Sequence, residues 1–289
     1  MTESTRTPRQ SGGLPRSPAA RLETADLEAL AVFADRLADV AAAEILPYFR
    51  ADAAAENKSR RVGDYDPVTL ADRAAETAIR AAIRKHYPGH GVLGEEFGFE
   101  PGSSGLIWVV DPIDGTKSFI TGLHHWATLI ALYDGEKPRL GLADQPYVGE
   151  RFFGDGKRAE LRRRGHPPRA LQARACAALN QATLCATGRD IFDGSAELAA
   201  FDAVAAKTRM VRYGGDCYLY CMLAAGLVDL VIESTLKAHD VQALIPIIEG
   251  AGGVISDWSG GSAVDGGRVV AAGDARLHRQ VTALLAGAG

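Results

Sequence analysis

A pair of aspartates follows a short apolar run, and its position predicts a metal site. Residues 106–110 predict a buried strand that ends at Asp111, after which a proline turns the chain. Asp114 comes next, and Gly115 and Thr116 open the following segment. Ligands of α/β sheets tend to lie beyond the carboxyl ends of strands, and free N–H groups at a helix start bind phosphate. Two carboxylates held there favour Mg²⁺, which prefers oxygen ligands, although both residues also suit turns and helix caps.

Three further acidic segments accompany this pair. Glu95 and Glu96 are flanked by glycines, and they repel each other unless they are solvated or bound to a cation. Asp72 follows Thr69 by three residues, so the two can close a capping box at a helix start. Asp240 precedes a predicted helix and can cap it. Each segment alone has an ordinary structural interpretation, so the prediction of a metal-binding cluster depends on their joint presence.

Helices and strands alternate along the elements that must position these acids. Helical periodicity and turn signals predict helices over residues 24–48, 69–86, 195–207, 216–225, 240–250 and 275–285. Short apolar runs predict strands over 106–110, 127–133, 140–143, 151–153, 182–186, 227–232, 254–256 and 268–272. The basic segment 157–169 is expected to be an exposed connection. This alternation predicts a mixed α/β protein of layered sheets and helices.

Length and charge narrow the function classes. The chain has 289 residues, of which 47% are apolar and 24% charged, with a net charge of -4. That composition is typical of a globular protein with ample core, and it argues against nucleic acid or an anionic membrane as a partner. No apolar run reaches the roughly 18 residues of a membrane helix. We expect a disordered tail over residues 1–22, then halves over 23–156 and 157–289 fused into one unit, the first carrying most metal ligands.

The cysteines indicate a reducing compartment. Cys176, Cys185, Cys217 and Cys221 form no Cys-x-x-Cys pair and have no zinc-site spacing with histidines. We therefore expect reduced thiols in the core of a cytoplasmic protein. The N-terminal segment has no apolar middle region of a secretory signal, which agrees with this expectation.

The order of the acidic motifs resembles that of the inositol monophosphatase-like family of metal-dependent phosphatases. The matching segments run from Asp66 to Asp72, Gly94 to Glu96, Trp108 to Thr116, and Asp240 to Gly253. The resemblance implies layers in the order α-β-α-β-α, a homodimer, and magnesium as the cofactor, with two or three ions per site. It also implies a small phosphate monoester as the substrate.

The resemblance also implies a ligand for each ion. Glu95, Asp111 and the backbone carbonyl of Ile113 would hold one magnesium ion. Asp111, Asp114 and Asp240 would hold a second, and Glu95 would also reach a third, weaker site. Phosphate monoesters hydrolyse slowly because water is a poor nucleophile and the transition state is highly charged. Paired cations address both problems, so a direct in-line attack by water is the expected mechanism.

Further residues acquire roles through the same resemblance. Thr116, together with Glu95, would orient the attacking water. The N–H groups of Gly115 and Thr116 would bind phosphate oxygens. Asp72 would lie close behind the metal ligands.

Within the family, the chain resembles the histidinol-phosphatase branch. It has Asp216 after two glycines, where inositol enzymes usually have small neutral residues, and His239 where they usually have tryptophan. Histidinol phosphate carries an ammonium and an imidazole, so its pocket should hold carboxylates beyond the metal ligands. Asp216 and Glu233 are the candidates, although Asp216 also suits a helix cap and Glu233 a surface acid.

These observations leave three hypotheses for the function. The first is a histidinol-phosphate phosphatase of histidine biosynthesis. The second is an inositol-1-monophosphatase or a broad sugar or nucleotide phosphatase of the same family. The third, from another class, is a non-catalytic magnesium-binding regulatory protein, against which the full set of acidic motifs argues.

Overall fold

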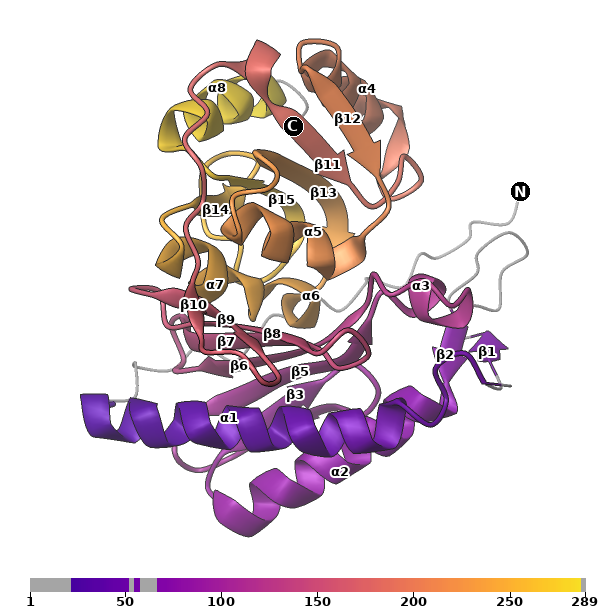
Figure 1. Cartoon of the computed structure of the whole chain (residues 1–289), viewed down its shortest axis with the longest axis vertical. Helices are drawn as coiled ribbons and strands as arrows, with labels where there is room; N and C mark the ends of the chain where they lie inside the picture. Colours follow the sequence, from indigo (N-terminus) through magenta and orange to yellow (C-terminus); the bar gives the residue numbers. More distant parts are fainter. Residues whose placement is uncertain (1–21, 52–54, 58–66, 287–289) are drawn as a thin grey trace, which may run out of the picture.

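The computed structural model describes residues 22–51, 55–57 and 67–286. The expected N-terminal tail and Asp66 lie outside the described residues, and so does the side chain of Thr69. The elements form layers in the order α-β-α-β-α, which confirms the expected fold class (Figure 1). Among the described residues, no helix is both long and apolar enough to cross a membrane.

The first layers come from the N-terminal part of the chain. Helices α1 (Thr24–Ile45) and α2 (Leu70–His86) cover one face of an eight-stranded sheet. The strand order of that sheet is β10-β9-β8-β7-β6-β5-β3-β4, with only β3 and β5 paired in parallel. Its strands are β3 (Gly91–Gly94), β4 (Gly98–Glu100), β5 (Ile107–Asp114), β6 (Ala127–Tyr133), β7 (Pro138–Gln145), β8 (Glu150–Gly154), β9 (Ala159–Arg163) and β10 (Arg169–Ala170).

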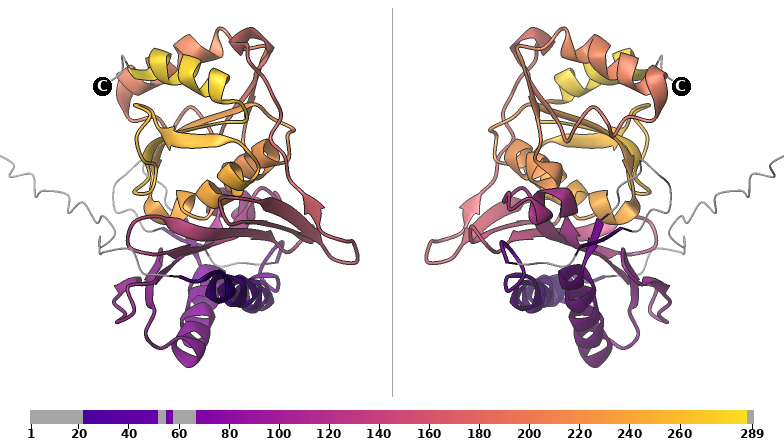
Figure 2. Two further views of the ribbon diagram at one scale, coloured as in Figure 1. Left: turned by 90° about the vertical axis from the view of Figure 1, so that its left-hand side faces the viewer. Right: turned by 90° about the vertical axis from the view of Figure 1, so that its right-hand side faces the viewer.

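A five-stranded mixed sheet forms the other half of the molecule, in the order β12-β11-β13-β15-β14. Its strands are β11 (Thr183–Ala186), β12 (Met210–Tyr213), β13 (Leu230–Leu236), β14 (Val254–Asp257) and β15 (Gly267–Ala272). Helices α5 (Asp216–Ala224), α6 (Ala238–Val241) and α7 (Leu244–Gly250) lie between the two sheets, and α4 (Gly194–Ala205) and α8 (Ala275–Leu285) cover the outer face (Figure 2). The remaining elements are β1 (Ala55–Asn57), β2 (Pro67–Thr69), α3 (Thr116–Ile120) and the 3₁₀ turn Leu179–Gln181.

Strand β5 shows how the apolar run builds two cores at once. Its side chains alternate between the faces of the sheet. Ile107 and Val109 join the cluster around α5–α7, whereas Trp108 and Val110 join the cluster beneath α1 and α2. Because both faces are covered, the strand is apolar throughout until it reaches Asp111, and this burial fixes where the carboxylate emerges.

The expectation of an exposed connection over 157–169 is wrong in part. Residues of β9 pair with β8, with Phe152 opposite Leu161, so the eight-stranded sheet continues through this segment. Alternation hides the strand in the sequence, because the buried residues Ala159 and Leu161 share one face while Arg162 lies on the other. Arg162 forms an ion pair with Asp35 of α1. Arg162 therefore lies on the face of the strand that is directed toward α1, opposite the face of Ala159 and Leu161.

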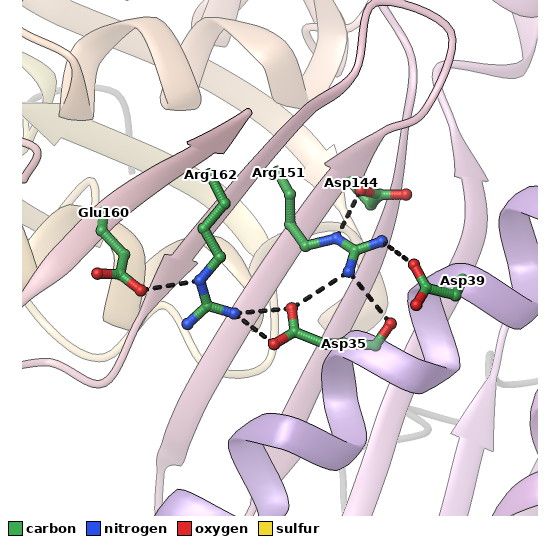
Figure 3. A network of polar contacts seen from close by, with 6 residues as sticks. All are labelled: Asp35, Asp39, Asp144, Arg151, Glu160 and Arg162. Atoms are coloured by element: carbon green, nitrogen blue, oxygen red, sulfur yellow. Dashed lines mark hydrogen bonds and ion pairs between the residues drawn. The ribbon is translucent and has the colours of Figure 1, made fainter. Parts of the chain in front are cut away.

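A network of ion pairs joins α1 to the strands above it (Figure 3). Arg151 of β8 contacts Asp35 and Asp39 of α1 and Asp144 of β7, at 3.2, 2.7 and 2.8 Å. Arg162 of β9 contacts Asp35 at 2.6 Å. The carboxylates around Arg151 hold the pKa of its guanidinium above the ordinary value despite its burial. The network fixes α1 against the sheet that carries the metal ligands.

Two helix boundaries differ from the sequence expectation. Glu23, and not Thr24, is the N-cap of α1, and its N–H donates to the Asp26 carboxylate at 3.3 Å. The helix expected over 240–250 is divided into α6 and α7. Pro246 explains the division, because proline has no N–H to donate and is tolerated only in the first turn of a helix, where the structure places it.

Candidate active site

A cavity of about 300 Å³ lies where the two halves meet. Most of the candidate site residues line it together: Glu95, Asp111, Ile113, Asp114, Gly115, Thr116, Asp216, Glu233 and Asp240. Asp72 does not line the cavity. It is buried in the first turn of α2, and its charge acts on Asp111 from behind.

The end of β5 shapes the metal-binding face of the cavity. Pairing with β6 becomes irregular between Asp111 and Asp114, so the strand bends and presents both carboxylates. The Ile113 N–H donates to Oδ1 of Asp111 at 3.1 Å, and the Thr116 hydroxyl donates to the Ile113 carbonyl at 3.1 Å. Gly115 has a φ of 87°, a conformation that a side chain would strain.

Ligand atoms gather in two adjoining groups among the described residues. Glu95, Asp111 and His239 form one group, and Asp111, Asp114 and Asp240 form the other. Within each group, one side-chain atom per residue lies within 4.8 Å of the others. Asp111 belongs to both groups, so it would serve both ions if each group held one. His239 was not among the expected ligands.

Burial and mutual repulsion make this cluster costly without a cation. Burial raises the pKa of Asp111 well above its ordinary value, and the charges of Glu95 and Asp114 raise it further. Burial and the charge of Asp240 do the same to the pKa of Asp114. The pKa of Asp240 is raised chiefly by burial. Because a divalent cation would offset both effects, this donor set fits a hard ion such as Mg²⁺.

A buried carboxylate in α2 holds the turn that carries Glu95. The Glu76 carboxylate accepts the N–H groups of Glu96 and Phe97, at 2.7 and 3.2 Å. Arg80, one helical turn further on, donates to Glu76 at 2.8 Å and balances its charge. These contacts fix the backbone of the turn and thereby the direction of Glu95. Sequence reasoning missed Glu76, although polar residues at helical spacing on an otherwise apolar face were a usable signal.

Asp216 lines the same cavity as the metal ligands, at the start of α5. Its φ is 45°, and it follows Gly215, the N-cap, whose φ is 134°. The Ser118 hydroxyl donates to Oδ2 of Asp216 at 2.7 Å, and burial raises the pKa of this carboxyl. The side chain of Asp216 therefore joins the start of α5 to Ser118 of α3.

Glu233 is a buried acid of β13, not a surface acid, with only 2% of its area exposed. It accepts a hydrogen bond from the Thr187 N–H at 2.8 Å and another from the Tyr220 hydroxyl at 3.1 Å. Burial outweighs these contacts and raises the pKa of Glu233 from 4.5 to about 7. Two carboxylates beyond the metal ligands thus face the same cavity.

Several hydrogen-bond partners of these residues were not predicted from the sequence. Tyr220 stands four residues after Asp216, and this helical spacing was the only signal that both face the cavity. The Cys217 N–H donates to Oδ2 of Asp114 at 2.8 Å. No sequence pattern marks that contact, because every residue except proline offers an N–H. All four cysteines are buried and free, as expected.

Known proteins resemble the chain over nearly its whole length. A model of the inositol monophosphatase family matches residues 26–288. The bifunctional phosphatase IMPL2, chloroplastic, of Arabidopsis thaliana is 43% identical over 271 residues, which make up 90% of this chain and 75% of the relative. The histidinol-phosphatase of Mycobacterium tuberculosis is 36% identical over 219 residues, 75% of this chain and 84% of the relative. A solved structure of an inositol monophosphatase from Zymomonas mobilis is 38% identical, with a TM-score of 0.76, and covers 90% of this chain and 98% of its own.

Proposed function

The chain belongs to the inositol monophosphatase family of phosphatases, and on this premise we propose that it hydrolyses histidinol phosphate with the help of Mg²⁺. The observation that carries the proposal is the pair Asp216 and Glu233, which line the cavity beside the metal ligands. Carboxylates in that position attract the ammonium and imidazole of histidinol phosphate more strongly than the hydroxyl groups of a neutral polyol, which only donate neutral hydrogen bonds to them. The 36% identity to a histidinol-phosphatase supports the same substrate.

We propose that the acids of the cluster bind two ions, with the ligands that the family resemblance implies for each. Glu95, Asp111 and the Ile113 carbonyl would hold one ion, and Asp111, Asp114 and Asp240 would hold the second. Bound magnesium makes water more acidic and stabilises the negative charge that develops on the leaving oxygen.

The protein groups then orient the reactants. Thr116 and Glu95 direct the attacking water, and the N–H groups of Gly115 and Thr116 hold the phosphate oxygens. The water oxygen forms a bond to phosphorus as the ester oxygen departs on the opposite side and takes a proton, which releases phosphate and histidinol. Asp216 and Glu233 hold the cationic end of the substrate.

Inositol 1-phosphate is the second candidate substrate. The solved inositol monophosphatase from Zymomonas mobilis is 38% identical to this chain, close to the identity of the histidinol-phosphatase. The relative from Arabidopsis thaliana is named a bifunctional phosphatase, which supports testing a second substrate as well. We also propose a homodimer by family resemblance, which sedimentation at twice the chain mass would support.

Phosphate release from a panel of substrates tests the proposal. The panel contains histidinol phosphate, inositol 1-phosphate, fructose 1,6-bisphosphate, adenosine 3′,5′-bisphosphate and a generic aryl phosphate, each with Mg²⁺. We expect histidinol phosphate to be preferred by about a hundredfold in kcat/KM, or roughly 2.7 kcal/mol in transition-state binding. A flat profile or a preference for inositol 1-phosphate would contradict the assigned substrate. No turnover of any ester would favour a non-catalytic magnesium-binding protein.

A further inference from the structure

His239 places a buried nitrogen against the carboxylate cluster. The side chain of His239 is 9% exposed, and its Nε2 atom has no hydrogen-bond partner among the residues that the structure describes. The ring belongs to the ligand group with Glu95 and Asp111, in which the candidate ligand atoms lie within 4.8 Å of one another. A buried polar atom without a partner costs free energy, and an ion bound between these three residues would supply the missing partner.

A role in holding the Asp240 carboxylate does not account for the position of His239. His239 Nε2 lies 3.3 Å from Oδ1 of Asp240, but without the geometry of a hydrogen bond. The other oxygen of Asp240 already accepts the Lys237 N–H at 2.7 Å, within the first turn of α6. The orientation of Asp240 is thus fixed by its own helix, and the imidazole nitrogen remains available.

The charges of the neighbouring residues also favour an ion at this position. Glu95 and Asp111 carry two negative charges, and a neutral imidazole adds a donor without adding charge, so the three ligands balance a divalent cation. Lys237 Nζ lies 3.5 Å from Oε1 of Glu95. The lysine side chain is 60% exposed and can move to solvent when an ion takes its place beside Glu95.

We propose that Nε2 of His239 is a ligand of the ion held by Glu95 and Asp111. The inference rests on the proposed metal centre, and it adds a nitrogen to what would otherwise be an all-oxygen site. Imidazole binds transition ions such as Co²⁺ and Zn²⁺ well. It binds Mg²⁺ poorly, because Mg²⁺ prefers oxygen ligands. This position therefore binds Mn²⁺, Co²⁺ or Zn²⁺ more tightly than oxygen ligands alone would, and Mg²⁺ gains little from His239.

Pulsed electron paramagnetic resonance of the metal-stripped full chain, loaded with one and then two equivalents of Mn²⁺, tests this ligand directly. We expect hyperfine coupling to nitrogen in the wild-type protein, and we expect ¹⁵N-labelled histidine to convert it to the ¹⁵N pattern. The coupling should disappear in His239→Phe and in His239→Gln. His278→Gln is the matched control, because His278 is equally buried but its Nε2 contacts Ser256 at 2.8 Å, outside the cluster.

Metal affinity gives a second readout. Calorimetric titration should show a loss of about 10- to 100-fold in Co²⁺ affinity for both His239 variants, while their Mg²⁺ affinity changes by less than about threefold. The retained Mg²⁺ binding also demonstrates that the variants are folded. Equal losses for both ions would mean that His239 only supports the carboxylates, and would overturn the proposal.

The spectroscopic outcome is independent of the substrate assignment. Wild-type protein without nitrogen coupling at either loading overturns the His239 ligand, whatever ester the enzyme hydrolyses. Coupling that persists in His239→Phe also overturns it. Nitrogen coupling in a protein that does not hydrolyse histidinol phosphate would leave the ligand in place and refute the proposed substrate alone.

Discussion

Asp114 illustrates how a single carboxylate can serve the chemistry of the site at the expense of stability. It belongs to one ligand group, and its Oδ2 accepts the Cys217 N–H at 2.8 Å. Asp114→Asn keeps the shape and an acceptor oxygen but removes the charge. We expect kcat/KM with Mg²⁺ to fall by about 10³-fold or more, or roughly 4 kcal/mol. Phosphate release measures this loss, and Glu136→Gln, a change at an exposed turn, should leave it unchanged.

The same substitution, which lowers activity, should raise the stability of the metal-free protein. Burial and repulsion raise the pKa of Asp114, so its charge destabilises the fold near neutral pH. Asp114→Asn should therefore unfold at a higher temperature than the wild type in the presence of a chelator. Near-wild-type turnover in this variant would show that the metal assignment is wrong.

Asp216 tests how the substrate is recognised. Asp216→Ala removes a carboxylate that faces the cavity but belongs to neither ligand group. We expect KM for histidinol phosphate to rise by about 10- to 100-fold, the effect of roughly 1.4–2.7 kcal/mol. KM for a neutral aryl phosphate should change far less, and kcat for that ester should be preserved. Equal changes for both esters would remove Asp216 from substrate recognition.

Glu233 gives a pH dependence of stability with a definite sign. The pKa of Glu233 is about 7 in the folded protein against an ordinary value of 4.5, so the folded state binds the proton more tightly. The stabilisation from protonated Glu233 is fully present below about pH 4.5 and is lost as the pH rises to about 7. Glu233→Gln should remove this dependence, which amounts to about 1–3 kcal/mol. Urea unfolding of both proteins between pH 5 and pH 8 measures the difference, and parallel curves would contradict the raised pKa.

At the scale of elements, regular periodicity was predictable and irregular pairing was not. The helix expected over 69–86 corresponds to α2, and the apolar run at 106–110 lies within β5, because burial of a whole face leaves a clear period. Strand β9 was missed because its arginines dominate the composition, while Ala159 and Leu161 are too few to reveal the alternation. The division between α6 and α7 follows from one proline within an otherwise helical pattern.

The candidate site was predictable from the sequence only where its residues lie close together along the chain. Asp111 and Asp114 belong to one strand end, so their proximity follows from the sequence alone. The contacts of Glu233 with Thr187 and Tyr220 join segments from β11, α5 and β13. Such contacts depend on how distant elements pack, and no local pattern encodes that packing.

The turn between β5 and α3 provides an element-scale prediction. A Cβ at Gly115 would lie 2.8 Å from the His125 carbonyl oxygen and 3.1 Å from Cβ of Asp216, and φ is +87°. Gly149 has a similar φ of +72° but nothing within 4 Å of such a Cβ. Gly149→Ala should therefore cost only the conformational strain of about 1–2 kcal/mol. Gly115→Ala should cost about 1–3 kcal/mol more.

Activity should separate the same two variants. Gly115→Ala displaces the turn that carries Asp114 and Thr116, so kcat/KM should fall by about 100-fold, because small displacements of positioned groups are costly. Gly149→Ala should retain its activity, since Gly149 lies in the turn between β7 and β8, away from the cavity. Chemical denaturation and phosphate release measure the two effects, and equal behaviour of both variants would contradict the role of the Gly115 turn.

At the scale of the whole molecule, α7 joins the two halves by close backbone contact. A Cβ at Gly154 of β8 would lie 2.3 Å from the Pro246 carbonyl oxygen, and the Gly156 N–H donates to that same oxygen at 3.1 Å. One apolar cluster includes Phe152 of the first sheet and Val231 of the second, on either side of α7. We therefore propose that the halves are fused into one unit that unfolds cooperatively.

Gly154→Ala should accordingly destabilise both halves together. The added methyl group has no space between β8 and α7, so we expect a loss of about 2–4 kcal/mol in the free energy of unfolding. In a Trp258→Phe background, tryptophan fluorescence reports on the first half through Trp108 and Trp126, while circular dichroism reports on helices of both halves. Both signals should change at one denaturant concentration, in the parent and in Gly154→Ala alike. A second half that unfolds separately would give two midpoints, and α7 would then be a contact between independent domains.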